Sequence, residues 1–224
     1  MYVVVVLRLA SSSPRRIELL RLLDVPFERS PADIDETAVA SPALAKADAI
    51  ARKGETTLAV DTEVLLDGEH LGKPRDDGEA VTMLADLAGQ THEVRSEIVV
   101  VTPSGKRTRF AVRSRVTLRP LSLREIERYV STGEPADKAG AYAIQGEGRR
   151  LVQAFEGCLA NITGLPLCHA YYALRRAAVV PLERPERACQ EHFAFVCPVW
   201  QTAQRQGRLA FDGAEFASWS DDLS

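Results

Sequence analysis

Serine, proline and arginine meet at residues 11–16 in a pattern that could hold a negatively charged group. Ser13 and Pro14 predict the start of a helix, which places Arg15 and Arg16 in its first turn. A helix N-terminus already carries partial positive charge, so two arginines there are unfavourable unless an anion binds them and the free backbone N–H groups. The alternative is that both point into water, because the chain has 23 arginines and only five lysines.

A second candidate is Asp61, which interrupts the apolar residues 57–66 of a predicted buried strand. An unpaired buried carboxylate is strongly unfavourable, so a metal ion, a reacting water or a ligand is the expected contact. Alternatively, Asp61 accepts a hydrogen bond from the backbone of a neighbouring loop. Thr62 beside it either orients a substrate or is an ordinary strand residue.

Isolated lysines and one amide side chain form the third group. Lys46 falls on a predicted helix, whereas Lys73 and Lys138 fall in Gly/Pro turns where a backbone can approach a phosphate. Taken singly, each lysine is better explained by a solvated side chain. Gln145 ends the segment DKAGAYAIQG, and its amide can offer a donor and an acceptor to a base edge. A tight loop with one aromatic residue is the alternative for that segment.

Several functional classes are excluded by what the sequence lacks. It has no GxxxxGK[ST] or GxGxxG loop, no Ser-His-Asp elbow and no HExxH motif. The net charge of -3 argues against a general surface for polymeric nucleic acid. Cys189, His192 and Cys197, with Cys168 or His169, could bind zinc, but the spacing is irregular and buried free thiols are the preferred interpretation.

The elements that would position these residues predict an α/β domain with a mixed β-sheet and flanking helices. Apolar runs and turn residues predict strands at 2–7, 57–66, 97–101, 110–118 and 150–155. Cap residues and helical spacing predict helices from Ser13, from Ser41 to about Lys53, from Asp76 to Gly89, from Ser122 to about Gly133 and from about 167 to 178. Residues 1–180 are expected to form the main domain, and 181–224, rich in proline at first and acidic at the end, an appendage of unknown role. No membrane span or signal peptide is recognisable, so we expect a cytoplasmic protein with no membrane partner.

Taken together, these segments resemble the Maf family of nucleoside triphosphate pyrophosphatases, which is also linked to septum formation. The matching segments follow the family's order: LASSSPRR at 9–16, DIDET at 33–37, AKA at 45–47, VDTEV at 60–64, LGKP at 71–74, LAGQTHEV at 87–94, TGEPADKAGAYAIQG at 132–146 and NITGLPL at 161–167. The DKAGAYAIQG form looks like the branch that acts on dTTP and UTP. The resemblance implies a mixed α/β sheet with two lobes around a cleft, a nucleoside triphosphate substrate and a possible homodimer.

The resemblance also implies roles for individual residues. Asp61 would be the general base that activates water, and Glu36 with Asp61 would hold a divalent metal, Mg²⁺ or Mn²⁺. The triphosphate would be bound by Ser11, Arg15, Lys46 and Lys73. The residues at specificity positions would be Arg16, Thr62 and Gln145.

Two residues depart from the family pattern beside the expected base. Val60 stands where the family has a smaller residue and would narrow the space next to Asp61. Glu63 would add a like charge, or serve as another metal ligand, because alternate residues of a strand share a face. These departures leave open an alternative function, a nucleotide-binding regulator linked to cell division that has lost turnover.

Overall fold

The computed structural model describes residues 6–209 and divides them into two compact units. The first unit comprises residues 6–61, 96–112 and 164–209, and the second comprises 62–95 and 113–163. The sheet has seven strands in the order β2-β1-β3-β5-β6-β7, with β4 paired to β3. Parallel pairs (β1 with β2 and β3) and antiparallel pairs (β3 with β4, β6 with β7) both occur, which confirms the predicted mixed α/β fold. The predicted cleft between two lobes stays a prediction.

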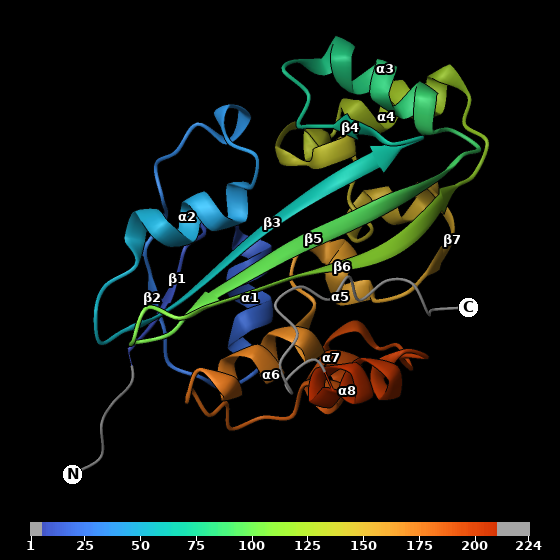
Figure 1. Cartoon of the computed structure of the whole chain (residues 1–224). Coiled ribbons are helices and arrows are strands. Elements are labelled where there is room, and N and C mark those ends of the chain that lie inside the picture. The colour runs from blue at the N-terminus through green and yellow to red at the C-terminus, as the bar shows by residue number, and fades with distance from the viewer. Residues whose placement is uncertain (1–5, 210–224) are drawn as a thin grey trace. The chain divides into compact units, whose positions relative to one another are not determined.

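Each of three long strands lies partly in the first unit and partly in the second (Figure 1). They are β3 (Thr56–Leu66), β5 (Thr91–Val101) and β6 (Arg107–Leu118). The boundary between the units falls within each of them: after Asp61 in β3, after Arg95 in β5 and after Val112 in β6.

The first unit surrounds the parallel part of the sheet with helices. Its other elements are β1 (Leu7–Leu9), α1 (Pro14–Arg21), β2 (Glu28–Arg29), the 3-10 turn η1 (Glu36–Ala38), α2 (Pro42–Ile50), α6 (Leu167–Arg176), α7 (Pro185–Phe193) and α8 (Trp200–Leu209). Small residues let α2 lie close to the sheet, because Ala43 and Ala47 pack against Ala59 and Val99 in one buried cluster. The predicted strand at 2–7 lies mostly outside the described residues, and β1 begins at Leu7.

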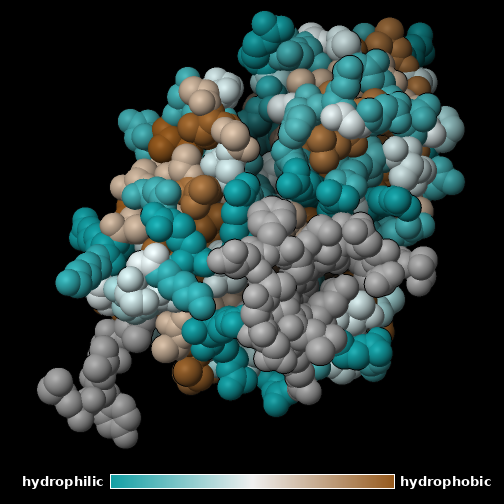
Figure 2. All heavy atoms as spheres, viewed as in Figure 1, coloured by the Kyte–Doolittle hydropathy of each residue, from teal (hydrophilic) through white to brown (hydrophobic). Residues whose placement is uncertain are grey.

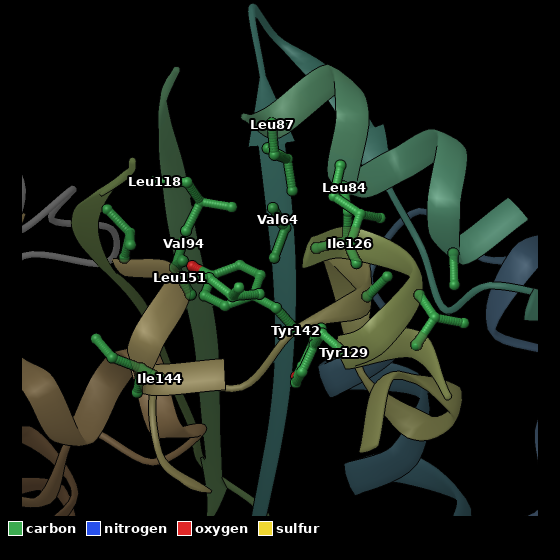
Figure 3. Packing of buried hydrophobic residues seen from close by; sticks show 14 residues of the cluster. Val64, Leu84, Leu87, Val94, Leu118, Ile126, Tyr129, Tyr142, Ile144 and Leu151 are labelled. Carbon is green, nitrogen blue, oxygen red and sulfur yellow. The ribbon is translucent and has the colours of Figure 1, made fainter. Parts of the chain in front are cut away.

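The second unit packs helices and turns around the other ends of the long strands. Its elements are β4 (Glu69–Leu71), α3 (Asp77–Leu87), α4 (Leu123–Val130), the 3-10 turns η2 (Glu134–Asp137), η3 (Ala139–Ala141) and η4 (Gly146–Leu151), β7 (Val152–Glu156) and α5 (Leu159–Thr163). Figure 3 shows its core, in which Val64 of β3 and Leu84 of α3 point toward side chains of α4. Tyr142 and Ile144 bring the DKAGAYAIQG segment into the same buried cluster.

Four further findings concern the surface, the helices, the metal-binding side chains and the cysteines. Hydrophilic and hydrophobic residues are interspersed on the face shown in Figure 2. Within residues 6–209, no helix has both the length and the apolar character needed to cross a membrane. In the same range, no three His, Cys, Asp or Glu side chains gather in a way that could hold a metal ion, so Cys189, His192 and Cys197 do not form the zinc site considered above. The four cysteines, each within the described range, form no disulfide bond with one another.

Candidate active site

The start of α1 is built as the sequence predicts. Ser13 caps the helix by accepting a hydrogen bond from the backbone N–H of Arg16 at 3.5 Å, and Pro14 occupies the first turn. The buried hydroxyl of Ser11 accepts a hydrogen bond from the backbone N–H of Ser13 at 3.2 Å. Arg15 is half-buried in the first turn. Basic side chains and helix N–H groups therefore gather at one helix end, an arrangement that favours an anion.

Arg16 reaches from this helix end to two fixed oxygen atoms. Its Nε donates to the carbonyl oxygen of Gly164 at 3.0 Å, and its Nη1 donates to Ser11 Oγ at 3.4 Å. Burial lowers the pKa of Arg16, while the carboxylates of Asp61 and Glu36 act in the opposite direction. Arg16 therefore links α1 to the turn before α6, and its charge lies in the field of both carboxylates.

Lys46 brings together the two carboxylates that the sequence singles out. Its Nζ lies 2.7 Å from Asp61 Oδ1 and 2.8 Å from Glu36 Oε1. The Lys46 residue is only 8% exposed, because its helix, α2, packs closely on the sheet. Asp61 comes from β3 and Glu36 from η1, where Asp35 caps the turn by accepting from the backbone N–H of Thr37 at 3.0 Å. A buried ammonium thus holds two carboxylates from different elements around one point.

The carboxylates of Asp61 and Glu36 are suitable ligands for a small divalent cation that a phosphate also contacts. Mg²⁺ is bound in proteins through one or two carboxylates together with substrate phosphates and waters. Asp61 and Glu36 supply two carboxylates that already converge on one cationic group. Lys46 leaves one of its three ammonium donors beyond those two contacts, and that donor can face an anionic substrate.

The remaining predicted site residues lie in the second unit. Thr62 follows Asp61 in β3 and is half-buried. Lys73 is exposed in the loop between β4 and α3. The neighbouring Gly72 accepts a hydrogen bond at 3.0 Å from the backbone N–H of Gly140, so the LGKP and DKAG turns lie side by side. Gly140 needs its positive φ of 68° and its missing side chain there, because a Cβ would lie 3.0 Å from Val64 Cγ1.

Gln145 lies on a segment that two buried tyrosines hold in place. The hydroxyl oxygen of Tyr129, on α4, accepts from the backbone N–H of Ala143 at 3.1 Å. Tyr142 Oη and His92 Nε2 share a buried hydrogen bond of 2.7 Å. Burial raises the pKa of Tyr142 and lowers that of His92 to about 4, so both groups are neutral at pH 7. Both tyrosines belong to the core shown in Figure 3.

Glu134 fixes the other side of the Gln145 segment. Its Oε2 accepts from the backbone N–H of Gly148 at 2.8 Å. A side chain at Gly148 would overlap the carbonyl oxygen of Ala143, so this close turn requires glycine. Lys138, by contrast, turns back on its own loop, donating to the carbonyl oxygen of Glu134 at 3.1 Å and pairing with Asp137.

Comparison with known proteins decides the family. The Maf family pattern, described as "Maf-like protein", matches residues 6–177. The chain belongs to the Maf family. A Maf relative named "dTTP/UTP pyrophosphatase" from Myxococcus xanthus is 46% identical over 183 residues, which cover 76% of this chain and 92% of the relative. Another of the same name from Anaeromyxobacter sp. is 47% identical and covers 75% and 88% of the two chains.

One solved structure is also similar, though weakly. It is a nucleoside-triphosphatase/dITP/XTP pyrophosphatase from Mycobacterium abscessus, 21% identical, with a TM-score of 0.36 over 50% of this chain and 72% of that one. A similarity at this level supports no conclusion about this chain. The Maf match ends at residue 177, and α7 and α8 pack against α6. The boundary predicted at residue 181 stays a prediction.

The structure shows the positions of Val60 and Glu63, the two residues that depart from the Maf pattern. Val60 is fully buried and, as the neighbour of Asp61 in a strand, points to the opposite face. Its side chain therefore does not narrow the space beside the Asp61 carboxylate, contrary to expectation. Glu63 pairs with Arg95 at 2.8 Å and with His70 at 2.9 Å, so its charge is matched by side chains instead of being offered to a metal.

The sequence did not identify the residues that hold Arg16 and the Gln145 segment in position. Tyr129, Glu134 and His92 position the Gln145 segment, and the Gly164 carbonyl positions Arg16. Gly164 lies in the NITGLPL segment that already carried the family resemblance, which was its available signal. Glu134 had the same kind of signal, because it lies in the TGEPADKAGAYAIQG segment. Tyr129 had none, because its partner lies 14 residues away in an irregular segment.

Proposed function

We propose that the chain is a nucleoside triphosphate pyrophosphatase that converts dTTP and UTP to the monophosphate and pyrophosphate. The observation that carries this proposal is Lys46 bridging Asp61 and Glu36 in the unit that also holds the basic start of α1. Membership of the Maf family and the names of relatives more than 40% identical support the choice of substrate.

Asp61 acts as the general base in this proposal. Its carboxylate takes a proton from a water whose oxygen forms a bond to the α-phosphorus, and the bond to the bridging oxygen of the β-phosphate breaks. Pyrophosphate leaves with the electron pair of that bond. Lys46 supports this role by fixing the orientation of the Asp61 carboxylate through a 2.7 Å contact.

Triphosphate binding is assigned to cationic and hydroxyl side chains. Arg15 and Ser11 contribute at the start of α1, Lys46 contributes its remaining ammonium donor, and Lys73 contributes an exposed ammonium. Glu36 and Asp61 would hold Mg²⁺ or Mn²⁺. When bound, such an ion offsets charge on the phosphates and lowers the pKa of a coordinated water.

Substrate choice is assigned to Arg16, Thr62 and Gln145. Uracil and thymine share the same pattern of donors and acceptors on the edge that carries O4 and N3–H. The Gln145 amide can meet that edge with one acceptor and one donor. The hydrogen bonds that Tyr129 and Glu134 make to Ala143 and Gly148 hold the backbone on either side of Gln145.

The test measures pyrophosphate release from dTTP, UTP, CTP, GTP and methylated GTP with Mg²⁺ or Mn²⁺. We expect turnover of dTTP and UTP, and a loss of about 10²- to 10⁴-fold in Asp61→Asn with binding retained, since the base is removed but the shape is kept. Asp48→Asn is the matched control, because Asp48 is exposed and pairs with Arg107. Binding of dTTP without turnover in the wild type would instead support the regulator, and full turnover in Asp61→Asn would remove Asp61 as the base.

A further inference from the structure

A hollow of about 450 Å³ lies among α6, α7 and α8, and we call it the α6–α8 hollow. Figure 1 shows these three helices side by side, α6 in orange and the other two in red. Four residues of α6 line it, together with residues at the start of α7 and Gln204 of α8. Its volume falls within the roughly 300–1,000 Å³ of pockets that bind small molecules. None of the residues assigned to the proposed reaction lines it.

One wall of the α6–α8 hollow is aromatic. Tyr171 and Tyr172 are adjacent on α6, with ring centroids 5.3 Å apart and ring planes nearly perpendicular. Arg175 lies one turn further along, with its guanidinium carbon 5.7 Å from the Tyr171 ring centroid and its Nη1 donating to Tyr171 Oη at 3.4 Å. The cation–π contact and the hydrogen bond both favour this orientation of the Tyr171 ring. An aromatic wall of this kind can stack with a planar ligand ring.

The rest of the lining is strongly basic. The described residues that line the hollow include three arginines, Arg175, Arg176 and Arg184, and the carboxylate of Glu186. Arg184 meets Glu186 only at 3.4 Å and is 73% exposed, so this contact does little to neutralise the group. The whole chain has a net charge of -3, which makes such a local excess of positive charge more pronounced.

We propose that the α6–α8 hollow binds a nucleotide, separately from the proposed reaction. Guanidinium groups bind phosphate oxygens through paired charge-assisted hydrogen bonds, and tyrosine rings stack on bases of any sequence. Gln204 adds an amide that can contact a sugar hydroxyl or base edge. Arg184, Glu186 and Gln204 lie beyond residue 177, so this site is completed by residues outside the Maf match.

The test uses uridine monophosphate with a photoreactive 5-iodo group, added to the full chain without metal, followed by mapping of the cross-linked peptide. We expect a cross-link on the peptide with Tyr171 and Tyr172. Arg184→Gln should reduce its yield about tenfold at limiting probe, the loss expected for one charge-assisted hydrogen bond. Arg187→Gln is the matched control, because Arg187 lies in the first turn of α7, three residues after Arg184, is equally exposed at 73% and does not line the hollow.

Arg176→Gln, on α6, repeats the test from a second helix in case Arg184→Gln disturbs the start of α7. Cross-links found only on other peptides, or equal yields in Arg184→Gln and Arg187→Gln, would overturn the proposal. Competition separates a nucleotide site from a simple anion site: unlabelled uridine monophosphate should compete at least tenfold better than inorganic phosphate. Equal competition would overturn the nucleotide assignment. Because the readout is a cross-link, it stands whether or not pyrophosphate release is observed.

Discussion

Lys46 is the residue on which the candidate active site depends most. Its ammonium, in a residue only 8% exposed, contacts Asp61 and Glu36 at 2.7 and 2.8 Å. Without that charge the partly buried Asp61 carboxylate and the exposed Glu36 carboxylate would face each other as like charges. Asp61 could be predicted from its sequence, because a carboxylate in an apolar strand needs a partner. The identity of the partner could not, because Lys46 lies 15 residues earlier on a helix whose packing no local pattern determines.

We expect Lys46→Met to lower pyrophosphate release by about 10²- to 10³-fold, the usual effect of removing one positioned donor to developing charge. Lys46→Arg keeps the charge and should recover part of that loss. Lys53→Met is the control, because Lys53 is exposed just beyond the end of α2. The measurement is kcat and KM for UTP in each variant. An unchanged kcat in Lys46→Met would show that the bridge has no part in turnover.

Helix starts and irregular segments differ in how far the sequence could predict them. The starts of α1 and α2 are confirmed at Pro14 and Pro42, because a serine cap and a following proline act within a few residues. α2 ends at Ile50, earlier than expected. The first half of β5 was missed because its buried face carries His92 and Ser96, which hide the alternation of apolar residues. The short α5 and the 3-10 turns depend on distant partners and had no clear local signal.

At the level of the Gln145 segment, we expect Tyr129→Phe to weaken substrate discrimination. The change leaves the Ala143 N–H without the acceptor now 3.1 Å away, and should lower the free energy of unfolding by about 1 kcal/mol. The ratio of kcat/KM for UTP over CTP should fall severalfold, with kcat for UTP little changed. Tyr171→Phe also removes a tyrosine hydroxyl but lies outside this segment, so its ratio should equal that of the wild type. A wild-type ratio in Tyr129→Phe would contradict the positioning role.

Two buried histidines connect the stability of the whole molecule to pH. His92 and His169 are 3% and 4% exposed, and burial lowers the pKa of each from 6.5 to about 4. The unfolded chain therefore binds more protons than the folded chain between pH 6.5 and pH 4, and stability must fall as the pH falls through this window. Above pH 6.5 neither group contributes to this effect.

We expect the free energy of unfolding, measured by urea titration, to decrease between pH 7 and pH 4 by on the order of 3 kcal/mol for each histidine. His169→Phe should reduce the slope, since a neutral ring can pack near Phe110 in place of the imidazole. The same slope in His169→Phe and wild type would show that His169 is not protonated on unfolding in this range.

The boundary between the two units passes directly between Asp61 and Thr62. The proposed base, its lysine and the basic helix start are therefore encoded in one set of segments, whereas Thr62 and Gln145 are encoded in the other. The chain passes between the units at four points: three lie inside the long strands, where backbone hydrogen bonding tolerates many side chains, and the fourth lies between Thr163 and Gly164, just after α5. Recombination at these four points could replace Thr62 and Gln145 while Asp61 and Lys46 are inherited unchanged, so that new nucleotide preferences could arise without new chemistry.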